Sequence, residues 1–277
     1  MMLHDSRLKA ISLAAALFAV FTLTSCKNAL EESAVKNSNE AYYFDAQRAM
    51  DSGLWDSAIA KLAALTPEFR ARRDVVGTTA SAYAGRCGLN MLLLAKSIAD
   101  NSSTRLFPLL LSNFRTATTG SISDCIEAEN RMRTLAPADD YTRLTPDENV
   151  FLAFVEFAKV GAILGTFGDL NHDGTVDPGF DSCQTPQLAD NYLREIGTGL
   201  NIAAASLVAS GSSIGSSAFS GISSACSSLP ASLNFCGVFT PAGFSVNMAK
   251  ALGGLVKAQD AVGVGTCTDT TPNCVCP

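Results

Sequence analysis

Hydrophobic positions recur every three or four residues along most of this 277-residue chain, a spacing that predicts amphipathic helices. Segments of this kind cover residues 40–50, 58–65, 75–87, 103–116, 121–135, 150–164, 188–208 and 244–256. We find no convincing run of alternating apolar and polar residues that would predict a strand. The pattern therefore predicts an all-α fold, a helical bundle that occupies residues 40–277 as a single domain.

Thr-Pro pairs, which are helix-start signals, occur at residues 66–67, 145–146, 185–186 and 240–241. Threonine can cap a helix whose first position is taken by the proline. The strongest of these signals is at Thr145, because Glu148 can reach back and complete a capping box. The helix that follows is apolar on more than one face, so we expect it to be central and mostly buried.

Glycines stand four residues apart at Gly161 and Gly165 and again at Gly211 and Gly215. This spacing occurs where membrane helices pair. Around the second pair, serines interrupt the apolar run well short of a spanning length, so close packing inside a soluble bundle is the favoured interpretation.

Residues 46–59 read AQRAMDSGLWDSAI. This string resembles the turn of a tetratricopeptide helix pair, in which small residues allow close contact, a glycine ends the first helix and an aromatic fills the corner. The residues in those places are Ala46, Gly53, Trp55, Ala58 and Ile59. The resemblance implies helix hairpins over residues 40–99, although any helical hairpin of a bundle would also fit. Residues 80–94 loosely resemble helix pairs of exported bacterial lipoproteins, including the T-components of tripartite periplasmic transporters.

The N-terminus carries two basic residues, a short apolar run over residues 10–22 and then the sequence LTSC, which ends at Cys26. The order is typical of a secretory signal and not of a membrane helix. LTSC resembles the bacterial lipobox, which implies that residues 1–25 are a lipoprotein signal peptide and that Cys26 carries lipid. Lys27 is not acidic, which favours the outer membrane, with the protein facing the periplasm or the cell surface. Residues 26–39 are then a flexible tether. The alternative is an ordinary signal peptide with an unmodified Cys26.

An acidic loop over residues 169–177 reads DLNHDGTVD. It resembles the calcium loops of EF-hands and dockerins, with a glycine at loop position six, Gly174, for the sharp turn. The ligands that this resemblance implies are the side chains at positions one, three, five and nine and the carbonyl at position seven, namely Asp169, Asn171, Asp173, Asp177 and Thr175. A helix–calcium loop–helix unit would then cover residues 145–210.

Position twelve departs from that pattern, because Phe180 stands where a bidentate acid is usual and Asp181 comes one residue late. Either the loop bulges so that Asp181 completes the coordination sphere, or water fills the gap and binding weakens. The alternative to a calcium site is a metal-free acidic turn.

Eight cysteines remain when Cys26 is set aside: Cys87, Cys125, Cys183, Cys226, Cys236, Cys267, Cys274 and Cys276. An even number in an exported protein predicts four disulfides. Zinc is the competing account of the last three, but the compartment is oxidising and the chain after residue 25 holds a single histidine.

Pairing cannot be fixed from sequence, since eight cysteines allow 105 connectivities. Cys226 with Cys236 is the favoured local pair, and Cys87 with Cys125 is expected to tie the early helices together. We expect the cysteine-rich tail, residues 262–277, to bond partly back to the body through Cys183.

Loss of residues 1–25 removes two basic residues and one acidic residue, which changes the net charge from −6 to −7. An acidic chain without a basic cluster argues against nucleic acids and anionic lipid surfaces as partners. There is no phosphate loop, dinucleotide fingerprint or zinc-protease motif, and the one histidine available as a base, His172, lies in the acidic loop.

These features favour a non-enzymatic protein. The first hypothesis is an outer-membrane lipoprotein that acts as a calcium-stabilised helical scaffold and binds another envelope protein. The second is a solute-binding accessory lipoprotein of a periplasmic transporter, with a cavity for an apolar or acidic small molecule. A carboxylate-based hydrolase is a distant third. The spacing of acidic residues in the sequence does not test it, because the fold places such carboxylates.

Overall fold

The computed structural model describes residues 37–100, 105–184, 188–212, 216–259, 262–269 and 271–277. Within those ranges the chain forms helices and short 3-10 turns, with no sheet and one isolated β-bridge between Ala258 and Cys267. The all-α prediction is confirmed. The predicted signal peptide (residues 1–25), the predicted lipid site Cys26 and most of the predicted tether lie outside the described residues.

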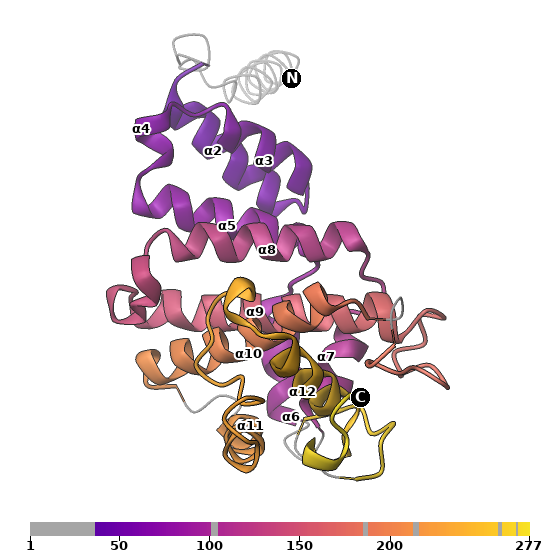
Figure 1. Ribbon diagram of the computed structural model, residues 1–277. Coiled ribbons are helices and arrows are strands. Elements are labelled where there is room, and N and C mark those ends of the chain that lie inside the picture. The colour runs from indigo at the N-terminus through magenta and orange to yellow at the C-terminus, as the bar shows by residue number, and fades with distance from the viewer. Residues whose placement is uncertain (1–36, 101–104, 185–187, 213–215, 260–261, 270) are drawn as a thin grey trace, which may run out of the picture.

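The helices are α2 (Asn39–Asp51), α3 (Trp55–Ala63), α4 (Pro67–Arg70), α5 (Arg73–Cys87), α6 (Met91–Asp100), α7 (Leu106–Asn113), α8 (Thr119–Arg133), α9 (Pro146–Gly168), α10 (Asp190–Ser210), α11 (Ser216–Ser228) and α12 (Val246–Lys257). They stack largely in chain order, α2 and α3 on α5, α5 on α8, α8 on α9, α9 on α10 and α10 on α12 (Figure 1). The short helices α6 and α7 depart from this order, because α7 packs on α9 and α6 contacts α7. α9 therefore lies near the middle of the stack.

The α2–α3 hairpin contains the small residues, the glycine and the aromatic that its sequence indicates. Ala46 and Ala58 are fully buried in the hydrophobic cluster that α2 and α3 share with α5. Gly53 has φ +69° between the helices, a conformation that costs glycine little. The ring of Trp55 covers Gly85 of α5 so closely that a Cβ there would lie 2.5 Å from it. The predicted helix hairpin is confirmed.

α9 is the core helix of the protein. Its capping box is formed as expected, since the Glu148 amide donates to Thr145 Oγ1 (3.3 Å) and the Thr145 amide donates to Glu148 Oε2 (2.7 Å). Within the described part of the chain, α9 is the one helix long and apolar enough to cross a membrane, and 78% of its most apolar window is buried inside the protein. This burial is what the core helix of a folded bundle requires.

Gly161 and Gly165 let α7 approach α9 closely, as the spacing predicts. A Cβ at Gly161 would lie 2.4 Å from the ring of Phe114, and one at Gly165 would lie 2.3 Å from the Phe114 carbonyl oxygen. Gly211 instead ends α10 with φ +71° and has open space around it, and Gly215 lies outside the described residues.

Two helix starts differ from the sequence-based prediction. Thr240-Pro241 begins only a 3-10 turn, and α12 begins later, where the Met248 amide donates to the side chain of Ser245 (3.2 Å). The reason is that Gly243, a weak helix former, lies two residues after Pro241 while Ser245 offers a second cap. α10 begins at Asp190, after Thr185-Pro186, which lies outside the described residues.

Four disulfides join the eight cysteines as Cys87–Cys125, Cys183–Cys276, Cys226–Cys236 and Cys267–Cys274. Their Cα–Cα distances run from 5.2 to 6.2 Å, within the range that a disulfide requires. The expected pairs are confirmed, including the return of the tail to Cys183. These bonds leave no thiol in the tail for zinc.

Candidate functional site

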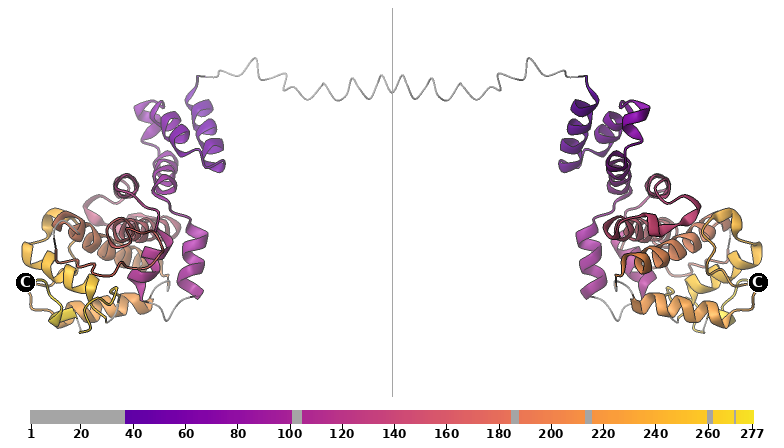
Figure 2. Two further views of the ribbon diagram at one scale, coloured as in Figure 1. Left: turned by 90° about the vertical axis from the view of Figure 1, so that its right-hand side faces the viewer. Right: turned by 90° about the vertical axis from the view of Figure 1, so that its left-hand side faces the viewer.

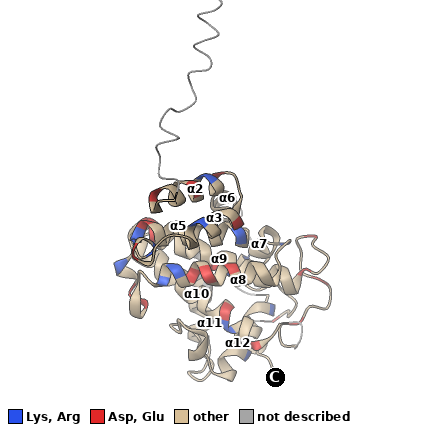
Figure 3. Ribbon diagram, turned by 90° about the horizontal axis from the view of Figure 1, so that it is seen from above, with Lys and Arg blue, Asp and Glu red and all other residues tan. Residues whose placement is uncertain are grey.

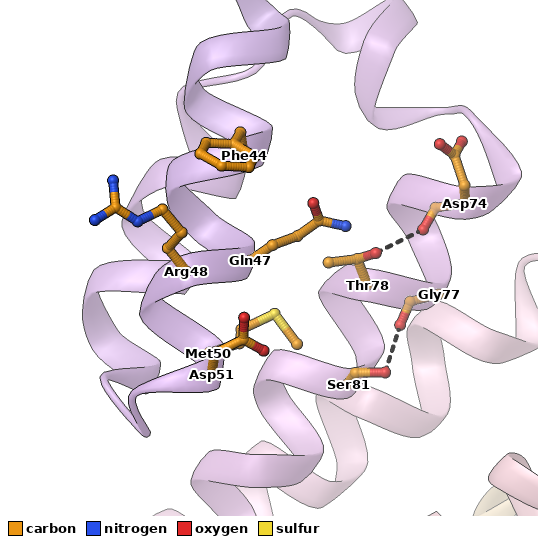
Figure 4. A pocket seen from close by; sticks show the side chains of 9 residues that line it. All are labelled: Phe44, Gln47, Arg48, Met50, Asp51, Asp74, Gly77, Thr78 and Ser81. Atoms are coloured by element: carbon orange, nitrogen blue, oxygen red, sulfur yellow. Dashed lines mark hydrogen bonds between the residues drawn. The ribbon is translucent and has the colours of Figure 1, made fainter. Parts of the chain in front are cut away.

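A groove of about 600 Å³ runs between α2 and α5 at one end of the helix stack (Figure 4). α2 contributes apolar and polar side chains, and α5 contributes small or hydroxylated ones. The lining residues are Phe44, Gln47, Arg48, Met50 and Asp51 from α2 and Asp74, Gly77, Thr78 and Ser81 from α5. α2 and α5, which α3 and α4 separate in the chain, run side by side along this groove (Figure 4).

The polar groups of the groove can both donate and accept hydrogen bonds. The Thr78 and Ser81 hydroxyls donate to carbonyls of their own helix, those of Asp74 (2.9 Å) and Gly77 (2.9 Å). The Thr78 oxygen also lies 2.8 Å from the Tyr43 hydroxyl, so the Ser81 oxygen keeps more acceptor capacity than the Thr78 oxygen. The Gln47 side chain points into the groove (Figure 4), and its amide offers donors and an acceptor together. This is the combination that peptide backbone requires.

The rim of the groove is apolar and charged. Phe44 is 59% exposed, which is unusual for a phenylalanine, and the Arg48 guanidinium lies 6.0 Å from its ring centroid. Asp74 pairs with Arg72 at 2.8 Å on the surface. The floor at Gly77 is open, because a Cβ there would meet no atom within 4 Å.

The acidic loop between α9 and α10 forms a compact turn held by its own carboxylates. Asp169 is fully buried and accepts from the amides of Asp173 (3.0 Å) and Gly174 (2.9 Å). Asn171 Oδ1 accepts from the Asp173 amide (2.9 Å), and Asp173 Oδ1 accepts from the Thr175 amide (2.8 Å). Gly174 has φ +87°, so the sharp turn predicted at this residue is present.

Asp173 is exposed, and its pKa lies below its usual value, chiefly because the Thr175 hydroxyl donates to the carboxylate. His172 has φ +60°, and its Nδ1 lies 2.5 Å from the carbonyl of Arg115, just after α7. This contact ties the loop to the neighbouring helix. It gives His172 a structural role in positioning the loop.

The last two predicted calcium ligands are positioned differently from each other. Asp177 Oδ2 accepts from the Leu170 amide (2.7 Å) inside the loop. Asp181 instead accepts from the Cys183 amide (2.9 Å) and lies 3.8 Å from Lys257 of α12. Over the described ranges, no group of three or more His, Cys, Asp or Glu side chains gathers closely enough to hold a metal ion. Calcium binding stays a prediction.

A buried ionic cluster, which the sequence reasoning missed, lies where α8, α9 and α10 meet. Lys159 of α9 is 0% exposed and contacts three carboxylates, those of Glu129 on α8, Glu156 on α9 at 2.8 Å and Glu195 on α10 at 3.3 Å. Arg133 extends the cluster by pairing with Glu129 at 2.9 Å. The signal that could have revealed it is the presence of Glu156 and Lys159 inside an otherwise apolar helix.

The cluster perturbs the protonation of its members. Burial, followed by the charge of Glu129, raises the pKa of Glu156 to about 8. Burial alone would lower the pKa of Lys159, but the three carboxylates outweigh it and hold that pKa above its usual value. Lys159 Nζ is within ion-pair distance of Glu156, yet neither Glu156 oxygen accepts a hydrogen bond of good geometry. Glu156 is therefore the least satisfied carboxyl of the cluster.

A second hollow, of about 320 Å³, lies on the apolar side of α10. Residues of α10 and α11 and of the segment after Cys236 surround it, among them Leu200, Ala204, Val208, Ile222 and Phe239. Asn201 at its edge donates to the carbonyls of Phe235 (2.8 Å) and Val238 (2.9 Å), which holds that segment in place.

The structure brings together the loop residues 169–177 and pairs all eight cysteines, while it places Asp181 against α12. The groove and the ionic cluster come from residues distant in sequence. No protein-family model matches this chain, and neither the curated proteins nor the solved structures gave a match. The function is therefore argued from the geometry of these sites.

Proposed function

We propose that this protein is a lipoprotein of the bacterial outer membrane that serves as a non-catalytic helical scaffold and binds a segment of another envelope protein in the α2–α5 groove. The observation that carries the proposal is the groove itself. It joins an exposed aromatic, Phe44, to an amide, two hydroxyls and charges of both signs. An extended peptide segment matches this chemistry, because it offers backbone donors and acceptors at every residue and side chains of mixed character.

Lipid at Cys26 and calcium at the acidic loop belong to the same proposal. Calcium would be held by the loop oxygens of Asp169, Asn171, Asp173, the Thr175 carbonyl and Asp177. These are the hard oxygen donors that the ion prefers. The contacts of Asp181 with Cys183 and Lys257 favour water over Asp181 as the final ligand. The ion would brace the connection between the core helix α9 and α10.

The test is site-specific photo-crosslinking in intact cell envelopes. A photoreactive residue at Gln47, inside the groove, is expected to give a discrete adduct with one protein. The matched control is the same residue at Ala60, which is exposed on α3 and does not line the groove.

A pair of substitutions then separates occupancy of the groove from stability. Gly77→Arg fills the groove and is expected to abolish the adduct, because the site has room for a Cβ and arginine is a better helix former than glycine. Gly77→Ala makes a similar backbone change without filling the groove and should keep the adduct. An adduct that persists in Gly77→Arg would contradict the proposal.

The apolar hollow beside α10 supports a second candidate, a solute-binding accessory protein of a periplasmic transporter. An apolar small molecule of modest size suits its leucine, alanine, valine and phenylalanine lining. Native mass spectrometry against a panel of apolar solutes tests it. Binding that Ala204→Trp removes would favour this candidate, whereas no binding at millimolar solute would reject it.

A further inference from the structure

α6 begins with three consecutive apolar side chains that protein does not cover. Met91, Leu92 and Leu93 are 38%, 79% and 59% exposed. The inner face of this helix packs through Leu94, which is buried, so the exposed side chains point away from the body. Single exposed leucines are common, but a contiguous set in the first turn of an outlying helix indicates an interaction surface.

α6 lies on the same lateral side of the helix stack as α2, near the opposite end of the stack in Figure 1. Figure 2 shows α6 as an outlying helix on the same side as α2, and Figure 3, seen from above, places the α2 and α6 labels near the same edge. One flat surface along this side would therefore meet both the beginning of α2 and the exposed end of α6.

The chain between Cys26 and the first described residue is short. Eleven residue steps separate Cys26 from Asn37, and a fully extended chain of that length spans at most roughly 40 Å. A lipid on Cys26 would thus hold Asn37, just before α2, within that distance of the bilayer. α6 lies on the same lateral side of the stack as α2.

From this placement and this tether length, we propose that the first turn of α6 inserts into the bilayer that holds the Cys26 lipid, with Met91, Leu92 and Leu93 entering the region below the headgroups. The inference rests on the lipid anchor of the proposed function. A one-turn apolar wedge reaches a depth of roughly 5–10 Å, which is the interfacial zone.

The charge next to the wedge decides what kind of membrane it fits. Lys96 pairs with Asp100 on the exposed part of α6, so the helix presents no unpaired cation to attract anionic lipid. Insertion would therefore be driven by apolar burial and would occur in uncharged phospholipid. The anchor supplies the second attachment that one small apolar wedge needs for stable membrane association.

The experiment uses the lipid-modified full-length protein reconstituted into uncharged phosphatidylcholine vesicles. Leu92→Trp is expected to show blue-shifted emission and loss of at least half of its added fluorescence when the acyl chains are brominated. The matched control is Val246→Trp, an exposed apolar site (57%) at the start of α12, which should show neither change. The native Trp55, packed on Gly85, gives a constant background that is subtracted.

Vesicle flotation, measured in parallel, separates the two proposals. Protein that floats with vesicles while Leu92→Trp stays unquenched would overturn the α6 insertion and leave the anchor intact. Protein that does not float would overturn both. Equal quenching at both sites would also overturn the insertion. A blue shift that appears without lipid as protein concentration rises would overturn it too, because it would mean that a second copy of the protein covers α6.

Discussion

At the scale of single residues, the buried lysine of α9 and its carboxylates are the least expected feature of this core. A buried ion pair gains little net stability, because the cost of removing charges from water offsets their attraction. Glu156 adds to that cost, since it is fully buried and its oxygens accept no hydrogen bond. The cluster nevertheless connects α8, α9 and α10, because Lys159 reaches a carboxylate on each.

We predict that Glu156→Gln stabilises the protein relative to wild type, by an amount that grows as the pH rises. Its folded-state pKa, about 8, lies above the ordinary value of 4.5, so between these values the folded protein holds a proton that the unfolded chain has released. The contribution of Glu156 to stability therefore falls from pH 4.5 to pH 8. Relative to wild type, the variant should gain about 1–3 kcal/mol at pH 8 and little at pH 4, as measured by urea unfolding.

Lys159→Met is the matched control for this prediction. It removes the cation that Glu129 and Glu195 share, and it should lower the free energy of unfolding by about 3–5 kcal/mol at pH 7. A Glu156→Gln protein that proves less stable than wild type at pH 8 would mean that Glu156 is ionised and well paired with Lys159 in the fold.

At the scale of elements, the connection between α9 and α10 depends on one acidic loop. Its carboxylates stabilise the turn by accepting backbone hydrogen bonds, and Asp169 does so from a fully buried position. If the loop holds calcium, the ion would stabilise the junction of two long core helices and would therefore act on the stability of the whole bundle.

We predict that calcium raises the melting temperature. A ligand that binds only the folded state adds about 2.7 kcal/mol at a concentration one hundred times its Kd. Thermal melts in calcium and in chelator should differ for wild type, and Asp169→Ala combined with Asp173→Ala should remove the difference. Asp181→Ala should keep it, because Asp181 is directed at Lys257. Identical wild-type melts in chelator and at millimolar calcium would contradict the prediction and show that the loop is a turn without a bound ion.

At the scale of the whole molecule, the C-terminal tail is joined to distant parts of the helix stack. Cys276 bonds to Cys183 across 93 residues and lies against Gly253 of α12, where a Cβ would come within 2.4 Å of its sulfur. The Cys276 amide also donates to the Lys250 carbonyl (3.2 Å). The tail is therefore attached both to α12 and to the segment that follows α9.

We predict that this disulfide stabilises the protein more than the local one in the tail. In the chain-entropy description, closing a loop of 93 residues contributes up to about 4–5 kcal/mol, and closing the seven-residue loop of Cys267–Cys274 contributes about 2–3 kcal/mol. Paired serine substitutions, compared by urea unfolding, measure both. Equal losses would show that the tail keeps its position through packing alone.

The sequence by itself determined the elements and several of their ends. Helical spacing predicted the all-α class because an amphipathic helix must repeat its apolar positions every three or four residues. The capping box at Thr145, the turn at Gly53 and the turn at Gly174 were also predictable, because each is a local interaction within a few residues. The disulfide between Cys226 and Cys236 was favoured for the same reason, since its cysteines are close in the chain.

Only the tertiary structure decided which distant residues meet. Lys159 contacts Glu129 and Glu195 because three helices from different parts of the chain pack together. No local spacing in the sequence predicts these two ion pairs. The groove forms where α2 and α5 lie beside each other, and the outward position of Leu92 follows from where α6 packs. Local hydrogen bonds and periodicity fix elements, whereas sites form where burial brings elements together, which depends on the whole chain at once.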